Sequence, residues 1–483
     1  MNYKSLFFFL FATSLSQAQT QLSSADDGES YSLTECIDYA LSHNISLRQS
    51  QLAVENSLVG LNQSKSDLLP TVNGSFNLNS NFGRNVDPFS NDVVTNAIGT
   101  NSIGAGASVV VYNGYRKRNT IDRNTLDLQA SQLDLEAQKN NISLNVAVAY
   151  LSVLSSEDVI EVAKQNVIVT NLQLERTQKL VSAGALPETN IFNLNAQLAN
   201  DQLNLVNARN GYRSSILTLK QNMNLMDDRE IKVVRVEVPS PSTEIYPETP
   251  SEVYDAAINY LPEVKSSQIR EKMAEKNIQI AKSVGLPSVF ANVNWGSAYS
   301  TAAKNITPGE TTFNAINASA TLDGQTVPFT LNLPQQSFNK ENIPYFNQLG
   351  NNQNMNAGIS VQIPIFNGYN KKYQMQTAQI QKLQSNLTTE STKVGIRQNI
   401  DQAYINMLNA SQSYSANTAQ VDALLRAFEA AEASYNAGAS NFVDYNLAKT
   451  NLDRALANQV QSKYDYLFKI KVLDFYQNKP LVF

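Results

Sequence analysis

Histidine and cysteine are almost absent, since the chain has one of each among 483 residues. Cys36 can form no intrachain disulfide, and one cysteine with one histidine cannot supply the ligands of a zinc site. The histidine, His43, stands near the expected end of a helix, which does not favour a catalytic triad. No glycine-rich phosphate-binding loop is present in the sequence. The sequence therefore predicts no enzyme activity, no metal and no cofactor.

Charged residues are also sparse, at 16% of the chain, with 37 Lys and Arg against 42 Asp and Glu. The basic residues are scattered, so no nucleic-acid partner is expected. Beyond the N-terminus, no apolar run reaches the ~20 residues of a transmembrane helix. The composition thus argues against a nucleic-acid-binding protein and against a helical membrane protein.

Residues 1–18 have the pattern of a secretory signal peptide. Lys4 gives a positive start, an apolar run covers residues 6–12, and small residues precede the expected cleavage site. The run is too short to span the ~30 Å hydrocarbon core of a bilayer as an anchor. We therefore expect the mature chain to begin near Gln19 and to leave the cytoplasm.

Four stretches alternate apolar and polar residues with the period of two that is typical of a β-strand. They cover about residues 71–82, 101–112, 288–299 and 354–365. None contains a charged residue, and each has at least the ~9–11 residues that a tilted strand needs to cross a bilayer. A soluble amphipathic hairpin would show the same alternation, but the signal peptide and the lack of charge favour membrane-spanning strands.

A very long helix is expected after the second strand, over about residues 113–182. This stretch opens with Tyr-Asn-Gly-Tyr at 112–115 and then holds no glycine or proline until Gly184. At ~1.5 Å per residue it reaches roughly 100 Å, far beyond an ordinary globular helix. A turn at Gly184 would lead into an antiparallel return helix over about 188–225. The long helix carries a coiled-coil heptad at Val146, Val153, Ile160, Val167, Leu174 and Val181.

The second half of the chain repeats the first. Phe-Asn-Gly at 366–368 matches Tyr-Asn-Gly at 112–114 with an offset of 254 residues, and Gly438 matches Gly184 with the same offset. The repeat predicts a second long helix and a second return helix, over about residues 369–436 and 442–477. The expected domains are a first repeat over 19–225, a linker over 226–250, a second repeat over 251–477 and a tail over 478–483.

The Leu-Pro pairs that precede the strands, at 69–70 and 286–287, are separated by only 217 residues. The shortfall of 37 residues against the offset of 254 indicates an insertion, which we place in the loop of the second hairpin, about 300–353, because loops tolerate insertion. Each repeat also opens with helical residues: one helix capped by Thr34 is expected to end before Pro70, and helical residues are expected over 251–284. A loose polar leader is expected over 22–31.

Four strands cannot close a barrel, and open sheet edges are not viable in lipid. The chain must therefore assemble with copies of itself if its strands lie in a membrane. Two chains would give eight strands and a narrow barrel that its own side chains fill, whereas three would give twelve strands and room for a lumen. The Asn, Ser and Gly residues of the polar strand faces suit a water-filled interior.

The order of these features resembles the TolC family of outer-membrane efflux proteins over essentially the whole mature chain. The resemblance rests on the duplication, on the Leu-Pro and aromatic-Asn-Gly motifs that flank the hairpins, and on the tip stretch from Tyr435 to Asp444. It implies a mixed α and β membrane protein, a homotrimer whose twelve-stranded transmembrane β-barrel, four strands per chain, is continued by a periplasmic α-helical coiled-coil tunnel. The implied function is the passive exit duct of a tripartite system that exports small molecules or proteins from a Gram-negative cell. The implied partners are outer-membrane lipid, a periplasmic adaptor (membrane fusion protein) and an inner-membrane transporter of the RND, ABC or MFS class.

The resemblance places the turns around Gly184 and Gly438 at the periplasmic end, where the helices narrow the tunnel. Asp444 matches an acidic position that forms a constricting ring in the family, and Asn190 stands there in the first repeat. Three carboxylates would favour cations through their concentrated potential. A carboxylate at a helix start is equally well explained by the helix dipole. The family's second ring position is Leu447 here, which indicates a more apolar gate.

Tyr435 matches a family tyrosine that ties neighbouring coils together by hydrogen bonding, although its place in the heptad also suits plain packing. Ser440 stands where family members can carry an arginine in the same network. The exposed turns are the expected contacts of the adaptor, although ordinary turn chemistry would explain their glycines as well. These contact residues are Ser182, Gly184, Leu186, Pro187, Gly438, Ala439 and Ser440.

Two other classes of protein share some of these features. A trimeric coiled-coil structural or adhesive stalk anchored by a β-barrel would combine long helices with strands, but it would need neither the polar strand faces nor the repeated turn. A periplasmic adaptor would have one coiled-coil hairpin and lipoyl-type domains, whereas this chain has two hairpins and no such domain. The export channel is therefore the favoured hypothesis.

Overall fold

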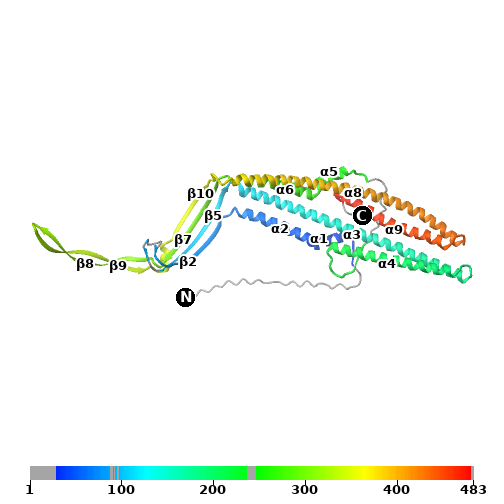
Figure 1. Ribbon diagram of the computed structural model, residues 1–483, viewed down its shortest axis with the longest axis horizontal. Coiled ribbons are helices and arrows are strands. Elements are labelled where there is room, and N and C mark those ends of the chain that lie inside the picture. Colours follow the sequence, from blue (N-terminus) through cyan, green and yellow to red (C-terminus); the bar gives the residue numbers. More distant parts are fainter. Residues whose placement is uncertain (1–28, 87–90, 92, 95–96, 236–245, 480–483) are drawn as a thin grey trace, which may run out of the picture.

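The computed structural model describes residues 29–86, 91, 93–94, 97–235 and 246–479. The expected signal peptide at 1–18 lies outside this part of the chain. The molecule is elongated, with a β-sheet toward one end and two bundles of long helices at the other (Figure 1). This arrangement separates the strands from the helix turns by the whole length of the helices.

The sheet contains the four strands expected from the alternating pattern. They are β2 (Thr71–Asn81), β5 (Ile98–Asn113), β7 (Ser288–Ser300) and β10 (Asn354–Gln362), in the antiparallel order β10-β7-β5-β2. The central pair β5–β7 joins the two repeats. Among the described residues, β10 and β2 are paired on one side only. The sheet therefore ends in two open edges, and β10 stops before Pro364, which has no backbone N–H to donate.

The two long helices are α3 (Arg116–Ser182) and α8 (Asn370–Asn436), and each has 67 residues. The return helices α4 (Thr189–Met223) and α9 (Phe442–Tyr476) each have 35 residues. None of the described helices is both long and apolar enough to cross a membrane. Each long helix begins after two consecutive residues of positive φ, first Gly114 (67°) and Tyr115 (63°), and in the second repeat Gly368 and Tyr369 (both 62°). The left-handed pair turns the chain from strand to helix, so α3 starts at 116 and not at the expected 113.

The helical start of the first repeat was expected as one helix capped by Thr34, and this is wrong. The structure has α1 (Leu33–His43) and α2 (Ile45–Ser66), with Ser32 as the first cap and Asn44 as the second. The Asn44 side chain accepts hydrogen bonds from the backbone N–H groups of Ser46 and Leu47. A side-chain cap of this kind satisfies donors that a helix start leaves free, which makes the break at Asn44 stable.

The second repeat has the same break. Its helices are α5 (Pro250–Tyr260) and α6 (Pro262–Ser283), separated at Leu261, which lies 217 residues after Asn44. The capping box is repeated at the same offset, because Thr249 and Glu252 pair as Ser32 and Glu35 do. Their hydrogen bonds to the cap residue lower the pKa of both glutamates. The two repeats therefore share the same helix-capping interactions at equivalent positions.

Residues 22–31 were expected to form a loose leader, and the described end of this stretch is instead a strand. β1 (Glu29–Tyr31) pairs in parallel with β6 (Ile231–Val233) beside the middle of α3. The Tyr150 hydroxyl of α3 donates to the carbonyl of Val234 at 2.6 Å. The apolar cluster beneath includes Cys36, which is fully buried, and burial raises its pKa to about 12. This thiol is therefore structural and unreactive.

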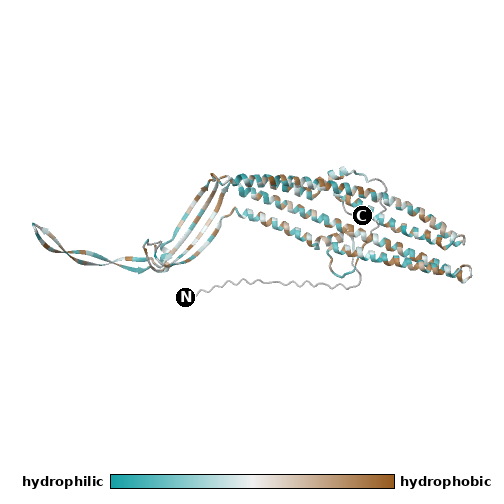
Figure 2. Ribbon diagram, in the orientation of Figure 1, coloured by the Kyte–Doolittle hydropathy of each residue, from teal (hydrophilic) through white to brown (hydrophobic). Residues whose placement is uncertain are grey.

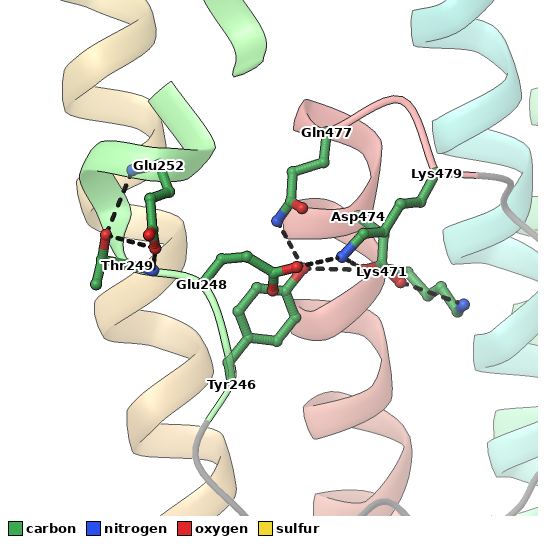
Figure 3. Close-up of polar contacts among 8 residues, drawn as sticks. All are labelled: Tyr246, Glu248, Thr249, Glu252, Lys471, Asp474, Gln477 and Lys479. Atoms are coloured by element: carbon green, nitrogen blue, oxygen red, sulfur yellow. Dashed lines mark hydrogen bonds and ion pairs between the residues drawn. The ribbon is translucent and has the colours of Figure 1, made fainter. Parts of the chain in front are cut away.

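The end of the second repeat is fastened to the inter-repeat linker (Figure 3). The Tyr246 hydroxyl donates to Oδ1 of Asp474 at 2.9 Å and accepts from Nε2 of Gln477 at 3.0 Å. Lys479 donates to Glu248 at 2.9 Å. These contacts hold the C-terminal end of α9 beside the start of α5, at the middle of the helical region.

The stretch 300–353 was expected to be a loop, and it is not. It contains the strands β8 (Lys304–Leu322) and β9 (Gln325–Asn342) and the short helix α7 (Tyr345–Asn351). The two strands form a hairpin whose turn, Asp323-Gly324, has positive φ at both residues. Asp-Gly is a preferred sequence for such a two-residue turn. Three prolines interrupt the alternation here, which conceals the strands in the sequence.

Candidate functional site

The two faces of the sheet differ in chemistry, because cross-strand partners share a face. One register row holds Asn73, Gly106, Asn294 and Asn356. Asn294 donates to Asn356 at 3.1 Å on this polar face. The next row, on the opposite face, holds Val72, Ala107, Val293 and Ala357. The sheet thus has one polar, uncharged face that suits water and one apolar face that suits lipid.

The apolar face is left open in the single chain. Val72 is 72% exposed, and Ile359, on the same face of the edge strand β10, is 77% exposed. Large apolar side chains exposed in a contiguous row mark a surface that another apolar phase covers. The hydrocarbon core of a bilayer is such an apolar phase. It suits these strands because they carry no charged residue, which would be costly to place in lipid.

The two turns at the far end of the helices have the same geometry. Gly184 has φ of 74° and Gly438 has φ of 72°, and both are exposed with no atom near the position of a Cβ. The N–H of Gly184 donates to the carbonyl of Val181 at 2.9 Å, and the equivalent bond of Gly438 goes to Tyr435 at 3.1 Å. These are left-handed helix ends that satisfy carbonyls of the last helical turn. Figure 1 shows the two turns at the same end of the molecule, opposite the sheet.

The other expected contact residues lie on these turns. Ser182 ends α3 and its hydroxyl donates to the carbonyl of Lys179 at 2.8 Å. Pro187 and Ala439 are exposed, and Leu186 is half-buried. Ser440 is half-buried, and its hydroxyl oxygen is buried without a hydrogen-bond partner in the described structure. The turns therefore present small and polar groups on a rigid backbone.

Asp444 lies in the first turn of α9 and is exposed. Its backbone N–H donates to the cap residue Asn441 at 3.0 Å, so the helix start is satisfied by Asn441 and leaves the Asp444 carboxylate free. Leu447, one helical turn further, is 60% exposed on the same face. Asn190 is half-buried at the start of α4, in the other hairpin. The single chain therefore exposes the Asp444 carboxylate and the Leu447 side chain near the start of α9.

Tyr435 packs within an aromatic cluster at the end of α8. Its ring is stacked on Tyr445 with the centroids 5.1 Å apart, and it meets Phe442 edge-on at 6.3 Å. Burial raises the pKa of Tyr435, while the neighbouring hydroxyl of Thr177 on α3 acts in the opposite direction. Within the described part of the chain, neither hydroxyl makes a hydrogen bond of ordinary geometry. Within one chain, Tyr435 therefore serves packing.

A buried ion pair that sequence reasoning missed connects the two hairpins above these turns. Nζ of Lys449 on α9 lies 3.2 Å from Oδ2 of Asp201 on α4, and each side chain is 2% exposed. Asp201 also accepts from Thr170 of α3 at 2.5 Å and from Gln197 at 2.8 Å. Lys449 further donates to Asp453 at 2.6 Å. We call these five residues the inter-hairpin charge cluster.

In the inter-hairpin charge cluster, the Asp201 and Asp453 carboxylates share the single ammonium group of Lys449. Burial raises the pKa of Asp453, and Lys449 opposes that rise. Burying charges costs free energy unless hydrogen bonds and opposite charges surround them, as they do here. The signal in the sequence was a lysine among apolar residues of α9, because Lys449 stands four residues after Tyr445 and three before Leu452, both buried. Its partner on α4 could not be identified from one sequence.

Among the described residues, no group of histidine, cysteine or carboxylate side chains could hold a metal ion. The buried polar groups described above hold helices together, and the Asp444 carboxylate is exposed. The arrangement has a polar, uncharged sheet face at one end and two exposed helix turns at the other.

A family model described as outer membrane efflux protein matches residues 36–225 and 253–473. Outer membrane protein TolC of Escherichia coli (strain K12) is 22% identical over 389 residues, which cover 76% of this chain and 72% of that protein. The crystal structure of the Campylobacter jejuni CmeC outer membrane channel aligns with a TM-score of 0.68 at 17% identity, over 93% of this chain and 87% of that one. The open state of the Neisseria gonorrhoeae MtrE outer membrane channel aligns with a TM-score of 0.65 at 17% identity, over 92% and 88%. At 17% identity, similarity to these two structures shows a shared fold and nothing about function.

Proposed function

The chain belongs to the outer membrane efflux protein family, and from this premise we propose how its sheet and its helix turns carry out export. The family consists of outer-membrane channels and is not an enzyme family; its members are trimeric and serve efflux systems. The protein is accordingly an outer-membrane efflux channel that extends into the periplasm.

The observation that carries the mechanism is the two-faced sheet with two open edges. In a closed ring of three copies, β10 of each chain pairs with β2 of the next, so that no backbone group faces lipid unpaired. Twelve strands leave a lumen, and the uncharged polar rows line it. An uncharged wall binds ions and organic solutes weakly, which suits a duct that passes varied cargo.

The helices continue this duct. The coiled helices α3 and α8 are each 67 residues long and reach roughly 100 Å at ~1.5 Å per residue. The turns at their ends lie opposite the sheet and so reach deepest into the periplasm (Figure 1). We infer that the periplasmic adaptor binds these turns and that an inner-membrane transporter of the RND, ABC or MFS class supplies the energy.

The adaptor contact can be tested with a photo-crosslinking residue at Ser182 or at Ala439, both exposed on the turns. We expect each to form an adduct with a membrane-anchored periplasmic protein that contains a helical hairpin, identified by mass spectrometry. The matched control is Ser391, which is exposed on α8 far from the turn. Absence of tip adducts, or equal adducts at all three positions, would show that the turns are not the docking site.

The gate can be tested at Asp444. Three copies of this exposed carboxylate would concentrate a negative potential of several kT at the narrow end. We therefore expect Asp444→Asn to reduce the preference for cations over anions by roughly several-fold, since surface potentials of this size act exponentially on ion concentration. Reversal potentials in planar bilayers under a salt gradient measure this preference.

The control for this experiment is Glu188→Gln, which removes one carboxylate from the turn before α4. Glu188 is exposed at the other hairpin, and we expect its loss to leave the reversal potential unchanged. If Asp444→Asn behaves like this control, Asp444 does no more than stabilise the start of α9, as first-turn carboxylates generally do.

A further inference from the structure

The hairpin β8–β9 projects from the end of the sheet that lies opposite the helices (Figure 1). Its strands have 19 and 18 residues, and β9 is exposed along its whole length. An isolated two-stranded hairpin is at best marginally stable in water, because it has no second layer to bury its side chains. A hairpin of this length therefore needs a surface that covers one of its faces.

The hairpin offers one face for such a contact. Cross-strand pairing places large apolar residues together on one side, and Figure 2 shows apolar residues along its length. The more apolar face contains Ile316, Ala318, Val327, Phe329, Leu331 and Leu333, with Asn314 beside Leu333. The opposite face contains Asn317, Ser319, Thr326, Thr330 and Asn332, with Phe313, Pro328 and Pro334 among them. Leu331 is 42% exposed and Leu333 is 48% exposed, so the apolar face is uncovered in the single chain.

The free strand edges do not suit the addition of a further strand. Pro328 and Pro334 lie in β9, opposite Ser319 and Phe313. A proline has no N–H, so these residues must occupy pairs whose backbone groups point outward, and they remove donors from the outer edge. Proline on an edge strand is a means by which proteins prevent edge-to-edge pairing. The contact must therefore be made by the apolar face.

The charge of the hairpin favours contact between copies of itself. Between Thr311 and Leu333 the only charged residue is Asp323, at the turn. A foreign protein would find no charges for specific recognition, while identical copies meet no like-charge repulsion on the apolar face. The hairpin also leaves the sheet between β7 and β10, and β10 is the edge strand that joins the next copy. Its base therefore continues the contact between copies.

Three such hairpins would stand within reach of one another. A barrel of twelve tilted strands spaced ~4.8 Å apart is roughly 20–25 Å across, and a strand of 19 residues at ~3.3 Å per residue extends about 60 Å. Because all three are tethered at one mouth, their contact is intramolecular within the trimer and gains the effective concentration of a short linker.

We propose that the three β8–β9 hairpins of a trimer pack their apolar faces together above the extracellular mouth of the channel, so that a second copy of this chain covers each face. The inference rests on the proposed closed trimer and adds to it an extracellular assembly that narrows or covers the exit. Each hairpin then buries its apolar row against its neighbours and turns its Asn, Ser and Thr row to water.

The test uses the full-length protein with Cys36→Ser, so that an introduced cysteine is alone. Leu331→Cys places a thiol on the apolar face, and Thr330→Cys places one on the polar face at the adjacent residue. After mild oxidation in intact outer membranes, we expect Leu331→Cys to give a disulfide-linked dimer from two of the three copies, and Thr330→Cys to remain monomeric on a non-reducing denaturing gel. The native mass of the purified protein reports separately whether the trimer forms.

The outcomes separate this inference from the channel itself. A trimer without the Leu331→Cys dimer, equal dimer at both positions, or an adduct of Leu331→Cys with a different protein would overturn the hairpin assembly and leave the channel standing. Absence of a trimer in the native protein would overturn both, whereas loss of the trimer only in Cys36→Ser would report damage to the buried site of Cys36, and the test is then repeated with Cys36 retained.

Discussion

Replacing Lys449 by methionine is expected to destabilise the helical region by about 3–5 kcal/mol, since this is the typical cost of removing one partner from a buried ion pair. Methionine keeps much of the length of lysine but leaves Asp201 and Asp453 without their counter-charge. The carboxylates must then take up protons or draw water between α4 and α9. Either response loosens the contact between the two hairpins, so we also expect a larger conductance through the tip.

The matched control for this substitution is Arg426→Met on α8. Arg426 pairs with Asp422 at 3.1 Å, and the two side chains are 75% and 63% exposed. An exposed pair of this kind contributes about 0–1 kcal/mol, so little change is expected. The second control adds Asp201→Asn to Lys449→Met, which removes one of the two unpaired carboxylates and should recover part of the loss.

Heat resistance of the assembled protein in detergent and single-channel conductance are the measurements. If Lys449→Met is as harmless as Arg426→Met in both, the inter-hairpin charge cluster does not hold the hairpins together. A loss of stability without a rise in conductance would assign the cluster to folding and remove it from the gate.

Val293→Arg is expected to prevent assembly. Val293 lies at the centre of β7 on the apolar face, between the small residues Ala107 and Ala357. An arginine that faces lipid near the bilayer midplane costs about 2–4 kcal/mol per copy, and a trimer would carry three of them. We expect little or no heat-resistant oligomer in the outer membrane, as judged by unheated denaturing gels of the membrane fraction.

The matched variant is Asn294→Arg, the same change at the next residue of the same strand. Asn294 lies on the polar face, where an arginine can be hydrated in the lumen. This variant should assemble and shift the ion preference toward anions. If Asn294→Arg blocked assembly while Val293→Arg did not, the polar face would be the one in contact with lipid, and the assignment of the lumen would be wrong.

The sheet and the long helices could be predicted from the sequence because they show local patterns that can be read along the chain. The strands alternate apolar and polar residues, and the long helix α3 contains no glycine or proline. Period-two alternation at Val72 and its neighbours gave β2 to within a residue of its end, and the absence of Gly and Pro up to Gly184 gave the end of α3. The starts of the helices were less well predicted, because they depend on the left-handed conformation of Tyr115 and Tyr369, which no period records.

Other features depend on pairs of residues that are distant in the chain. The break at Asn44 needs a side-chain cap in place of an ordinary helical turn, and β1 exists only because Ile231–Val233 lies beside it. The pairing of Lys449 with Asp201 joins positions 248 residues apart. The hairpin β8–β9 was missed because prolines obscured its alternation, although its Asp-Gly turn was visible in the sequence.

The conductance of the purified protein in a planar lipid bilayer tests the central claim most directly. The account predicts discrete current steps for the native protein and larger steps for Lys449→Met. Reconstituted trimers that give no steps, either as the native protein or as Lys449→Met, would contradict the claim that the chain forms an export channel.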